Sequence, residues 1–78
     1  MREKTLKLIV TFHTTTGAMA MEALCKEKEV AGRLIPVPRA ITAGCGLSWC
    51  APLECRAEIE DLTRENGLDT DGFYEIPV

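Results

Sequence analysis

Four cysteines are the most reactive side chains in this 78-residue chain, and one of them stands between two glycines. Cys45 lies in the segment Ala43-Gly44-Cys45-Gly46, where glycine on both sides allows a tight turn and leaves the thiol unshielded. Free cysteine is usually among the most buried residues, so a cysteine at the tip of a loop is unusual. The position suits a nucleophilic thiol, and it also suits a tight hairpin in which Cys45 merely replaces serine or alanine.

The other cysteines have different surroundings. Cys45, Cys50 and Cys55 recur in a Cys-x4-Cys-x4-Cys pattern, which matches neither the Cys-x2-Cys pairs of zinc sites nor iron–sulfur motifs. We therefore expect no bound metal and no cofactor. In a regular strand at about 3.3 Å per residue, Cys45 and Cys50 would be about 16 Å apart, too far for one disulfide or one metal ion. Cys50 and Cys55 are closer, so a thiol pair or a metal site there stays open, whereas Cys25 and Cys55 lie on apolar helical stripes typical of core residues.

Charge and hydropathy limit the classes of partner. Nine Lys and Arg residues against twelve Asp and Glu give a net charge of −3, which offers no basic surface for nucleic acid or an anionic membrane. The apolar run Leu8-Ile9-Val10 after the charged start is too short for a secretory signal, and no apolar stretch could span a membrane. We expect a cytoplasmic protein with reduced thiols, folded as one domain over residues 1–78.

The apolar periodicity predicts six elements that must position these side chains, in the order strand, helix, strand, strand, helix, strand. We expect strands over residues 6–12, 33–38, 47–50 and 73–78, a helix that ends near residue 29, and a second helix from about residue 52 to 66. This order predicts an α+β fold, the ferredoxin-like βαββαβ sandwich, with two helices on one face of an antiparallel sheet. The second and fourth strands are the edges of that sheet, and they alone contain proline, at Pro36, Pro38 and Pro77.

In this topology the end of the first strand, the start of the first helix and the loop between the second and third strands share one end of the sheet. We therefore expect His13 and the first helical turn to lie near Cys45, where a helix N-terminus, a histidine and guanidinium groups favour a thiolate. Cys45 and His13 could then act as nucleophile and base, although a lone histidine beside three threonines also fits a capping or solvated residue. The residues expected to bind an anion or stabilise the thiolate are Thr14, Thr15, Thr16, Arg33, Arg39, Gly44 and Gly46.

Three segments together resemble one small bacterial and archaeal family. They are Thr15-Thr16 with Ala18-Met19-Ala20-Met21-Glu22, then Gly32-Arg33-Leu34-Ile35-Pro36-Val37-Pro38-Arg39, then Ala43-Gly44-Cys45-Gly46-Leu47-Ser48-Trp49. The chain is similar over almost its whole length to the family described as putative selenium/sulfur carrier-like proteins.

The resemblance implies that Cys45 accepts sulfur or selenium as a persulfide or selenosulfide and passes it to a partner. It implies a donor protein, such as a cysteine desulfurase, and an acceptor protein, and it favours a carrier over a stand-alone enzyme. Cys25, Cys50 and Cys55 are not matched to the family pattern, so a resolving-cysteine or metal role stays open for them, with Cys50 and Cys55 as the candidates for a second thiol.

Two other functions fit the same residues. A non-enzymatic ferredoxin-like regulatory or adaptor module could bind a small anion or a protein at the same loop end, and a small metal carrier could use the thiols. Alkylation of Cys45 near neutral pH faster than a free model thiol would favour the carrier, and a metal that copurifies near one equivalent would favour metal transport.

Overall fold

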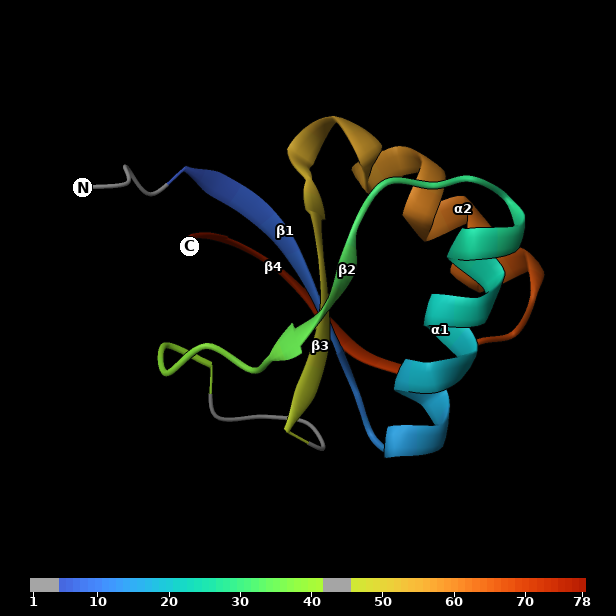
Figure 1. Cartoon of the computed structure of the whole chain (residues 1–78), viewed down its shortest axis with the longest axis horizontal. Helices are drawn as coiled ribbons and strands as arrows, with labels where there is room; N and C mark the ends of the chain where they lie inside the picture. The colour runs from blue at the N-terminus through green and yellow to red at the C-terminus, as the bar shows by residue number, and fades with distance from the viewer. Residues whose placement is uncertain (1–4, 42–45) are drawn as a thin grey trace.

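The computed structural model describes residues 5–41 and 46–78, in which four strands form one antiparallel sheet with two helices on one face (Figure 1). The elements are β1 (Leu6–Phe12), α1 (Thr15–Glu27), β2 (Arg33–Pro36), β3 (Leu47–Pro52), the 3-10 turn η1 (Leu53–Cys55), α2 (Arg56–Glu65) and β4 (Thr70–Pro77). The sheet order is β2-β3-β1-β4, with every neighbouring pair antiparallel. The predicted α+β fold with ferredoxin-like element order is confirmed, and β2 and β4 are the two edges as predicted, although the central strand β3 also ends in a proline, Pro52.

The hydrophobic core lies between the sheet and the helices. Because side chains alternate across a strand, Leu8, Val10 and Phe12 of β1 face the helices, and each is fully buried. The other buried members of this cluster are Ala18, Met21, Cys25, Val30, Trp49, Ala51, Ile59 and Leu62. Cys25 is thus a core residue, as its helical spacing predicts.

Helix α1 ends at Glu27, two residues before the end near residue 29 that the sequence predicts. Thr14 is its N-cap: the Thr14 Oγ1 accepts a hydrogen bond of 3.1 Å from the backbone N–H of Gly17. At the other end Glu29 adopts a φ of 57°, and the N–H of Val30 turns back to donate to the Cys25 carbonyl at 2.8 Å. This left-handed residue ends the helix before Gly32, the residue expected to stop it.

The prediction that Pro52 lies in the first turn of the second helix is wrong. Pro52 has an extended backbone (φ −60°, ψ 147°) and is the last residue of β3, two residues beyond the expected strand end. A turn of 3-10 helix follows, and α2 begins only at Arg56. The expected end of this helix at Asn66 and Gly67 is confirmed, with the N–H of Asn66 bonded to the Leu62 carbonyl at 3.1 Å.

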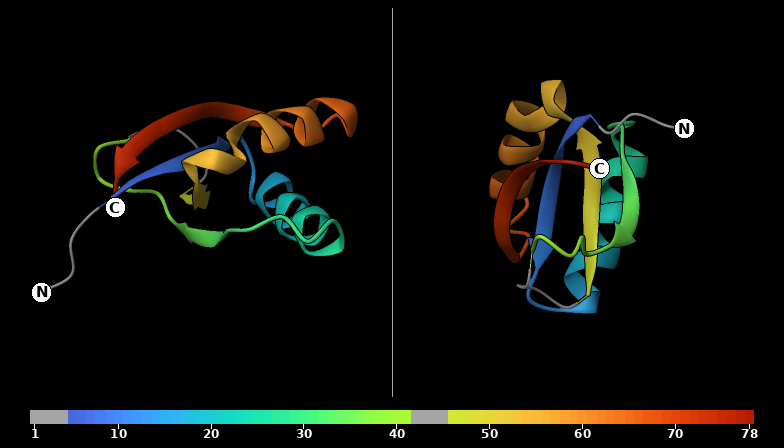
Figure 2. Two further views of the ribbon diagram at one scale, coloured as in Figure 1. Left: turned by 90° about the horizontal axis from the view of Figure 1, so that it is seen from above. Right: turned by 90° about the vertical axis from the view of Figure 1, so that its left-hand side faces the viewer.

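The connection from β2 to β3 folds back across the face of the sheet that the helices leave open (Figure 2). The N–H of Val37 donates to the Gly46 carbonyl at 3.0 Å, and Ile41 on this connection is only 6% exposed. Ile9, Thr11 and Ser48 point to the same helix-free side and are nevertheless fully buried. The connection therefore gives one end of the open face a cover of its own.

Candidate functional site

One end of the sheet gathers the segments that the sequence predicts to act together. The register pairs Thr11 of β1 with Ser48 of β3, and Pro36 of β2 with Leu47 of β3. The end of β1, the start of α1 and the β2–β3 connection therefore lie at the same end, as expected. Cys45 and Gly44 lie outside the described residues.

His13 follows β1 directly and lies beside two carboxylates. Its Nδ1 is 3.4 Å from Asp71 Oδ1 and its Nε2 is 3.8 Å from Asp69 Oδ1. Asp71 is fixed from a second side, because its Oδ2 accepts a 3.3 Å hydrogen bond from the hydroxyl of the buried Thr11. Asp71 is the nearer of the two carboxylates and lies beside Nδ1, which leaves Nε2 open to exchange a proton with a third group.

Neither aspartate is predicted from the sequence to lie at this site. With the last strand expected from residue 73, Asp69 and Asp71 fall in a turn with no assigned neighbour. The strand in fact starts at Thr70 and pairs antiparallel with β1 (Thr11 with Gly72, Phe12 with Thr70), so its first residues reach His13. The sequence does contain an indication of the earlier strand start, because Thr70 extends the alternating pattern of the strand toward its N-terminus.

The three threonines of the predicted anion site have separate roles. The Thr14 hydroxyl is used on the helix itself, as the N-cap of α1. Thr15 and Thr16 are exposed in the first helical turn. Gly17, next in the chain, packs so closely that a Cβ there would come within 3.2 Å of the Asp69 carbonyl, which fixes the helix start against the segment before β4.

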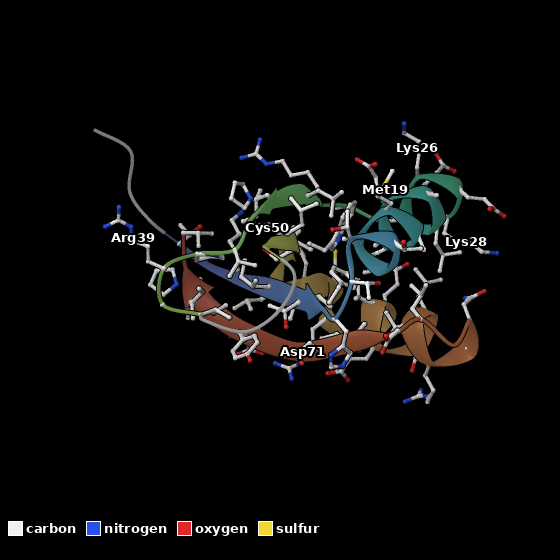
Figure 3. The ribbon with its side chains drawn as sticks, turned by 90° about the horizontal axis from the view of Figure 1, so that it is seen from below. Met19, Lys26, Lys28, Arg39, Cys50 and Asp71 are labelled. Carbon is white, nitrogen blue, oxygen red and sulfur yellow. The ribbon has the colours of Figure 1, made fainter. Side chains whose placement is uncertain are left out.

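Arg33 and Arg39, the two arginines predicted to stabilise the Cys45 thiolate, do not lie together at this end of the sheet. Arg33 starts β2 and lies opposite Cys50 in the register, at the end of the strand away from the β2–β3 connection. Arg39 is exposed on that connection, and Figure 3 shows it well apart from Asp71. Gly46 is exposed with a φ of 97° and has open space around it.

Three cysteines lie within the described residues, and all three are free. Burial, then the charges of Glu58 and Cys55, raise the pKa of Cys25 from 9.0 to about 11. Burial, with Glu58 and Glu54, also raises the pKa of Cys55, against a smaller lowering by a hydrogen bond from the Ala31 backbone. Both thiols are therefore held in the protonated form at neutral pH, which disfavours them as nucleophiles.

Cys50 lies in a different environment, half-buried on the helix-free face. Within residues 5–41 and 46–78, no group of three or more His, Cys, Asp or Glu side chains is placed to hold a metal ion. A metal ion bound by Cys50 and Cys55 would therefore find no third protein ligand within this part of the chain, and the two thiols are not joined in a disulfide.

Residues 7–75 match the family described as putative Se/S carrier protein-like, nearly the whole length of the chain. The chain belongs to this family. Membership in the Se/S carrier-like family agrees with the resemblance carried by the segments around Gly32 and Cys45. No curated protein and no solved structure matches the chain significantly. Within the described ranges, none of the helices of this Se/S carrier-like protein is long and apolar enough to cross a membrane.

Proposed function

We propose that this protein carries sulfur or selenium on Cys45, with His13 as the base that receives the thiol proton. The observation that supports the proposal most directly is the His13–Asp71 pair at the end of the sheet that also holds the β2–β3 connection. Thr11 fixes Asp71, and Asp71 orients the imidazole. A base held in one orientation by a carboxylate is a recurrent way to activate a nucleophile.

The transfer requires no redox partner. The Cys45 thiol gives its proton to His13, and the thiolate attacks the outer sulfur of a persulfide on the donor. The bond between the two donor sulfurs breaks, the donor leaves as a thiolate, and a persulfide remains on Cys45. Attack by an acceptor thiolate on that outer sulfur then passes the sulfur on, and the same steps with selenium give a selenosulfide.

The exposure at this end of the sheet fits transfer between proteins. His13, Thr15 and Thr16 are all exposed, so a donor such as a cysteine desulfurase could bring its persulfide up to the site without a deep pocket. The acceptor would dock at the same end in the next step. A carrier needs only one presented sulfur atom, which suits a chain of 78 residues.

The carboxylates argue against a pure anion-binding adaptor at this end. Asp69 and Asp71 add negative charge beside the first turn of α1, and like charge disfavours a bound anion. A general base is compatible with the same carboxylates, because a base that accepts a proton gains positive charge and does not repel them. The site therefore supports proton transfer at a thiol better than anion capture alone.

Peptide mass spectrometry tests the proposal. The protein is incubated with a cysteine desulfurase and free cysteine, alkylated, and digested. We expect one added sulfur atom on the Cys45 peptide, lost in Cys45→Ser and retained in the control Cys25→Ser. Equal labelling of the other cysteines in Cys45→Ser, with none on Cys45 in the native chain, would overturn the proposal.

A further inference from the structure

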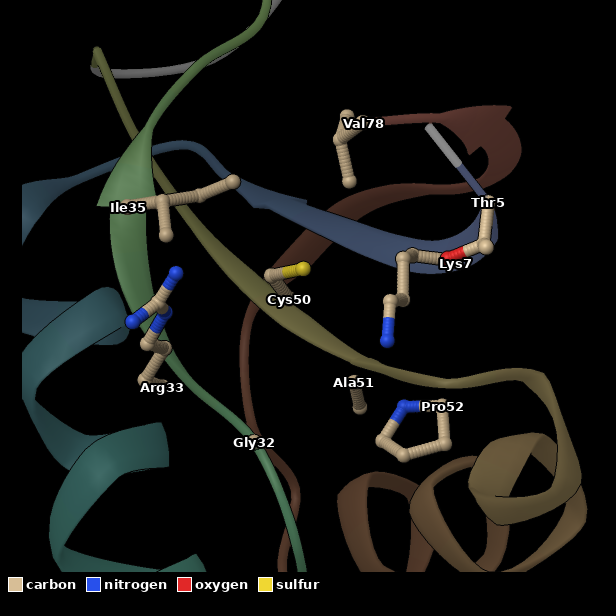
Figure 4. Close-up of a pocket in the computed structure, with 9 residues that line it drawn as sticks. All are labelled: Thr5, Lys7, Gly32, Arg33, Ile35, Cys50, Ala51, Pro52 and Val78. Carbon is tan, nitrogen blue, oxygen red and sulfur yellow. The ribbon is translucent and has the colours of Figure 1, made fainter. Parts of the chain in front are cut away.

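Cys50 points away from the core into a groove on the helix-free face. Its neighbours in β3, Trp49 and Ala51, are buried in the core cluster, so the alternation of the strand turns the Cys50 side chain to the opposite face. The groove has a volume of about 510 Å³. Its lining residues include Lys7 near the start of β1, Arg33 at the start of β2 and Pro52 at the end of β3, which lie away from the β2–β3 connection (Figure 4).

Two cationic side chains flank the Cys50 thiol. Arg33 of β2 is its direct partner in the register, and directly opposed residues have Cβ atoms about 5 Å apart. On the other side Ile9 of β1 is opposite Cys50, and Lys7, two residues earlier, projects from the same face. Figure 4 shows the sulfur between the Arg33 guanidinium and the Lys7 amine, both lining the groove.

Neither of these cations is neutralised by a carboxylate within residues 5–41 and 46–78. The other ion pairs of that part of the chain are made elsewhere: Arg56 binds Glu60 and Glu75, and Arg64 binds Asp61. Lys7 and Arg33 make no such pair. On a chain of net charge −3, two uncompensated cations around one thiol form a local site for an anion.

The rim and walls of the groove are fixed by tight packing. Gly32 has a φ of 135°, and a Cβ there would come within 2.4 Å of Trp49 Nε1 and 2.8 Å of the Cys50 carbonyl. The backbone of Val78 is paired with Thr5 through hydrogen bonds of 3.1 and 3.4 Å. Ile35 and Val78 add apolar walls, so the volume suits a small ligand with a compact charge.

We propose that this groove is a second sulfur-loading site, in which Lys7 and Arg33 hold a small dianionic donor of the thiosulfate class against Cys50. The inference rests on the proposed carrier function for the element transferred, but it uses a different thiol and a different donor. A dianion matches the two cations, and its terminal sulfur can face the Cys50 thiol. Selenosulfate has the same charge and shape, with selenium as the transferred atom.

The step balances without an added oxidant. The Cys50 thiol loses its proton to water, and the thiolate attacks the terminal sulfur of thiosulfate. The sulfur–sulfur bond of thiosulfate breaks, and sulfite leaves with the electron pair. Cys50 keeps the terminal sulfur as a persulfide, while the lost proton is taken up by sulfite or buffer.

The other described thiols do not fit this role. Cys25 is fully buried in the core, and Cys55 packs against the same cluster. Neither lines the groove, and the nearby Glu58 repels an anion from both of them. Cys50 is the described cysteine with direct access to the cationic groove.

The anion site is tested by removing its two positive charges and comparing reagents of opposite charge at Cys50. Cys50 is modified with an anionic and with a cationic methanethiosulfonate, and the two rates are read from the Cys50 peptide by mass spectrometry. We expect the anionic-to-cationic rate ratio to fall about tenfold in the double variant Lys7→Met with Arg33→Met. The matched control, Lys26→Met with Lys28→Met, removes the same charge from α1 and lies far from Cys50 (Figure 3), so its ratio should stay close to that of the native chain. An unchanged ratio in the groove variant would overturn the site.

Thiosulfate itself tests the transfer and separates the two proposals. We expect one added sulfur atom on the Cys50 peptide, retained in Cys45→Ser, lost in Cys50→Ser, and reduced about tenfold in the groove variant. Loading of Cys45 by a desulfurase together with no loading of Cys50 by thiosulfate would overturn this inference alone. Loading of Cys50 in a chain whose Cys45 accepts no sulfur would overturn only the function proposed for Cys45. Slower modification of Cys50 in thiosulfate with no added sulfur would overturn the transfer step.

Discussion

The Nδ1 of His13 lies 3.4 Å from Oδ1 of Asp71, a residue fifty-eight positions later in the chain. The antiparallel pairing of β1 with β4 brings them together, and the Thr11 hydroxyl holds the other oxygen of the Asp71 carboxylate. The last strand thus supplies a part of the site that local sequence around Cys45 does not contain. The Asp71 carboxylate is therefore held in place beside a half-exposed imidazole.

Asp71→Asn should slow sulfur loading of Cys45 by about tenfold, because the neutral amide removes the negative charge that lies 3.4 Å from the imidazole proposed to receive the thiol proton. The rate is measured with limiting desulfurase by mass spectrometry of the Cys45 peptide. Asp69→Asn is the matched control: its carboxylate is 3.8 Å from Nε2 and 66% exposed, so its effect should be smaller. Equal rates for Asp71→Asn and the native chain would remove Asp71 from the mechanism.

Thr14→Ala should lower the free energy of unfolding by about 1 kcal/mol, because the variant loses the side-chain cap on the Gly17 N–H. Urea denaturation measures the change. Thr15→Ala is the control, since Thr15 is exposed and is not the capping residue, and its effect should stay within about 0.5 kcal/mol. A loss of the same size in both variants would show that the first turn depends on something other than the cap.

Much of the fold can be predicted because local sequence patterns, such as the positions of prolines, have direct structural consequences. Pro36 and Pro77 lack an N–H for a sheet ladder, which suits edge strands, and each is the last residue of an edge strand. Pro52 misled the prediction because proline suits a first helical turn and a strand end equally well. Its extended ψ is fixed by the pairing of β3 with Lys7 on β1, a long-range contact that local sequence does not show.

The site was less predictable for a related reason. The shared end of the sheet follows from topology alone, so His13 and the β2–β3 connection were placed correctly. The placement of Arg33 depends on strand register, which sets it opposite Cys50 and not at the connection. Asp71 depends on where β4 begins, and strand ends are the positions that sequence patterns define least well.

Gly32→Ala should destabilise the protein by at least about 2 kcal/mol, because the new methyl group meets the Trp49 ring and the Cys50 carbonyl at a positive φ. Trp49 is the only tryptophan in the chain, so its fluorescence emission reports the displacement of the ring directly. Gly67→Ala is the control: its φ of 62° is also positive but its surroundings are open, so we expect a cost of about 1 kcal/mol and unchanged emission. A smaller loss for Gly32→Ala than for Gly67→Ala would contradict the close packing at the groove rim.

Stability should fall at alkaline pH through Cys25. Its pKa is raised to about 11 in the folded protein against 9.0 for an unperturbed thiol, so between these values the folded state keeps a proton that the unfolded state has lost. The contribution is complete below pH 9 and is lost as the pH rises toward 11. A shift of this size corresponds to roughly 2–3 kcal/mol of unfolding free energy.

Urea denaturation at a series of pH values, compared with Cys25→Ala, isolates this effect because the two proteins differ in no other titratable group. We expect the native chain to lose stability more steeply than Cys25→Ala as the pH rises from 9 to 11. Glu58→Gln gives a second variant that leaves the core intact: it removes a negative charge that helps to raise the pKa of Cys25 in the folded protein, so the loss should still begin near pH 9 but should be smaller and end at a lower pH. Native-state alkylation of Cys25 should become faster in this variant for the same reason. Parallel stability curves for all three proteins would show that Cys25 does not titrate with folding.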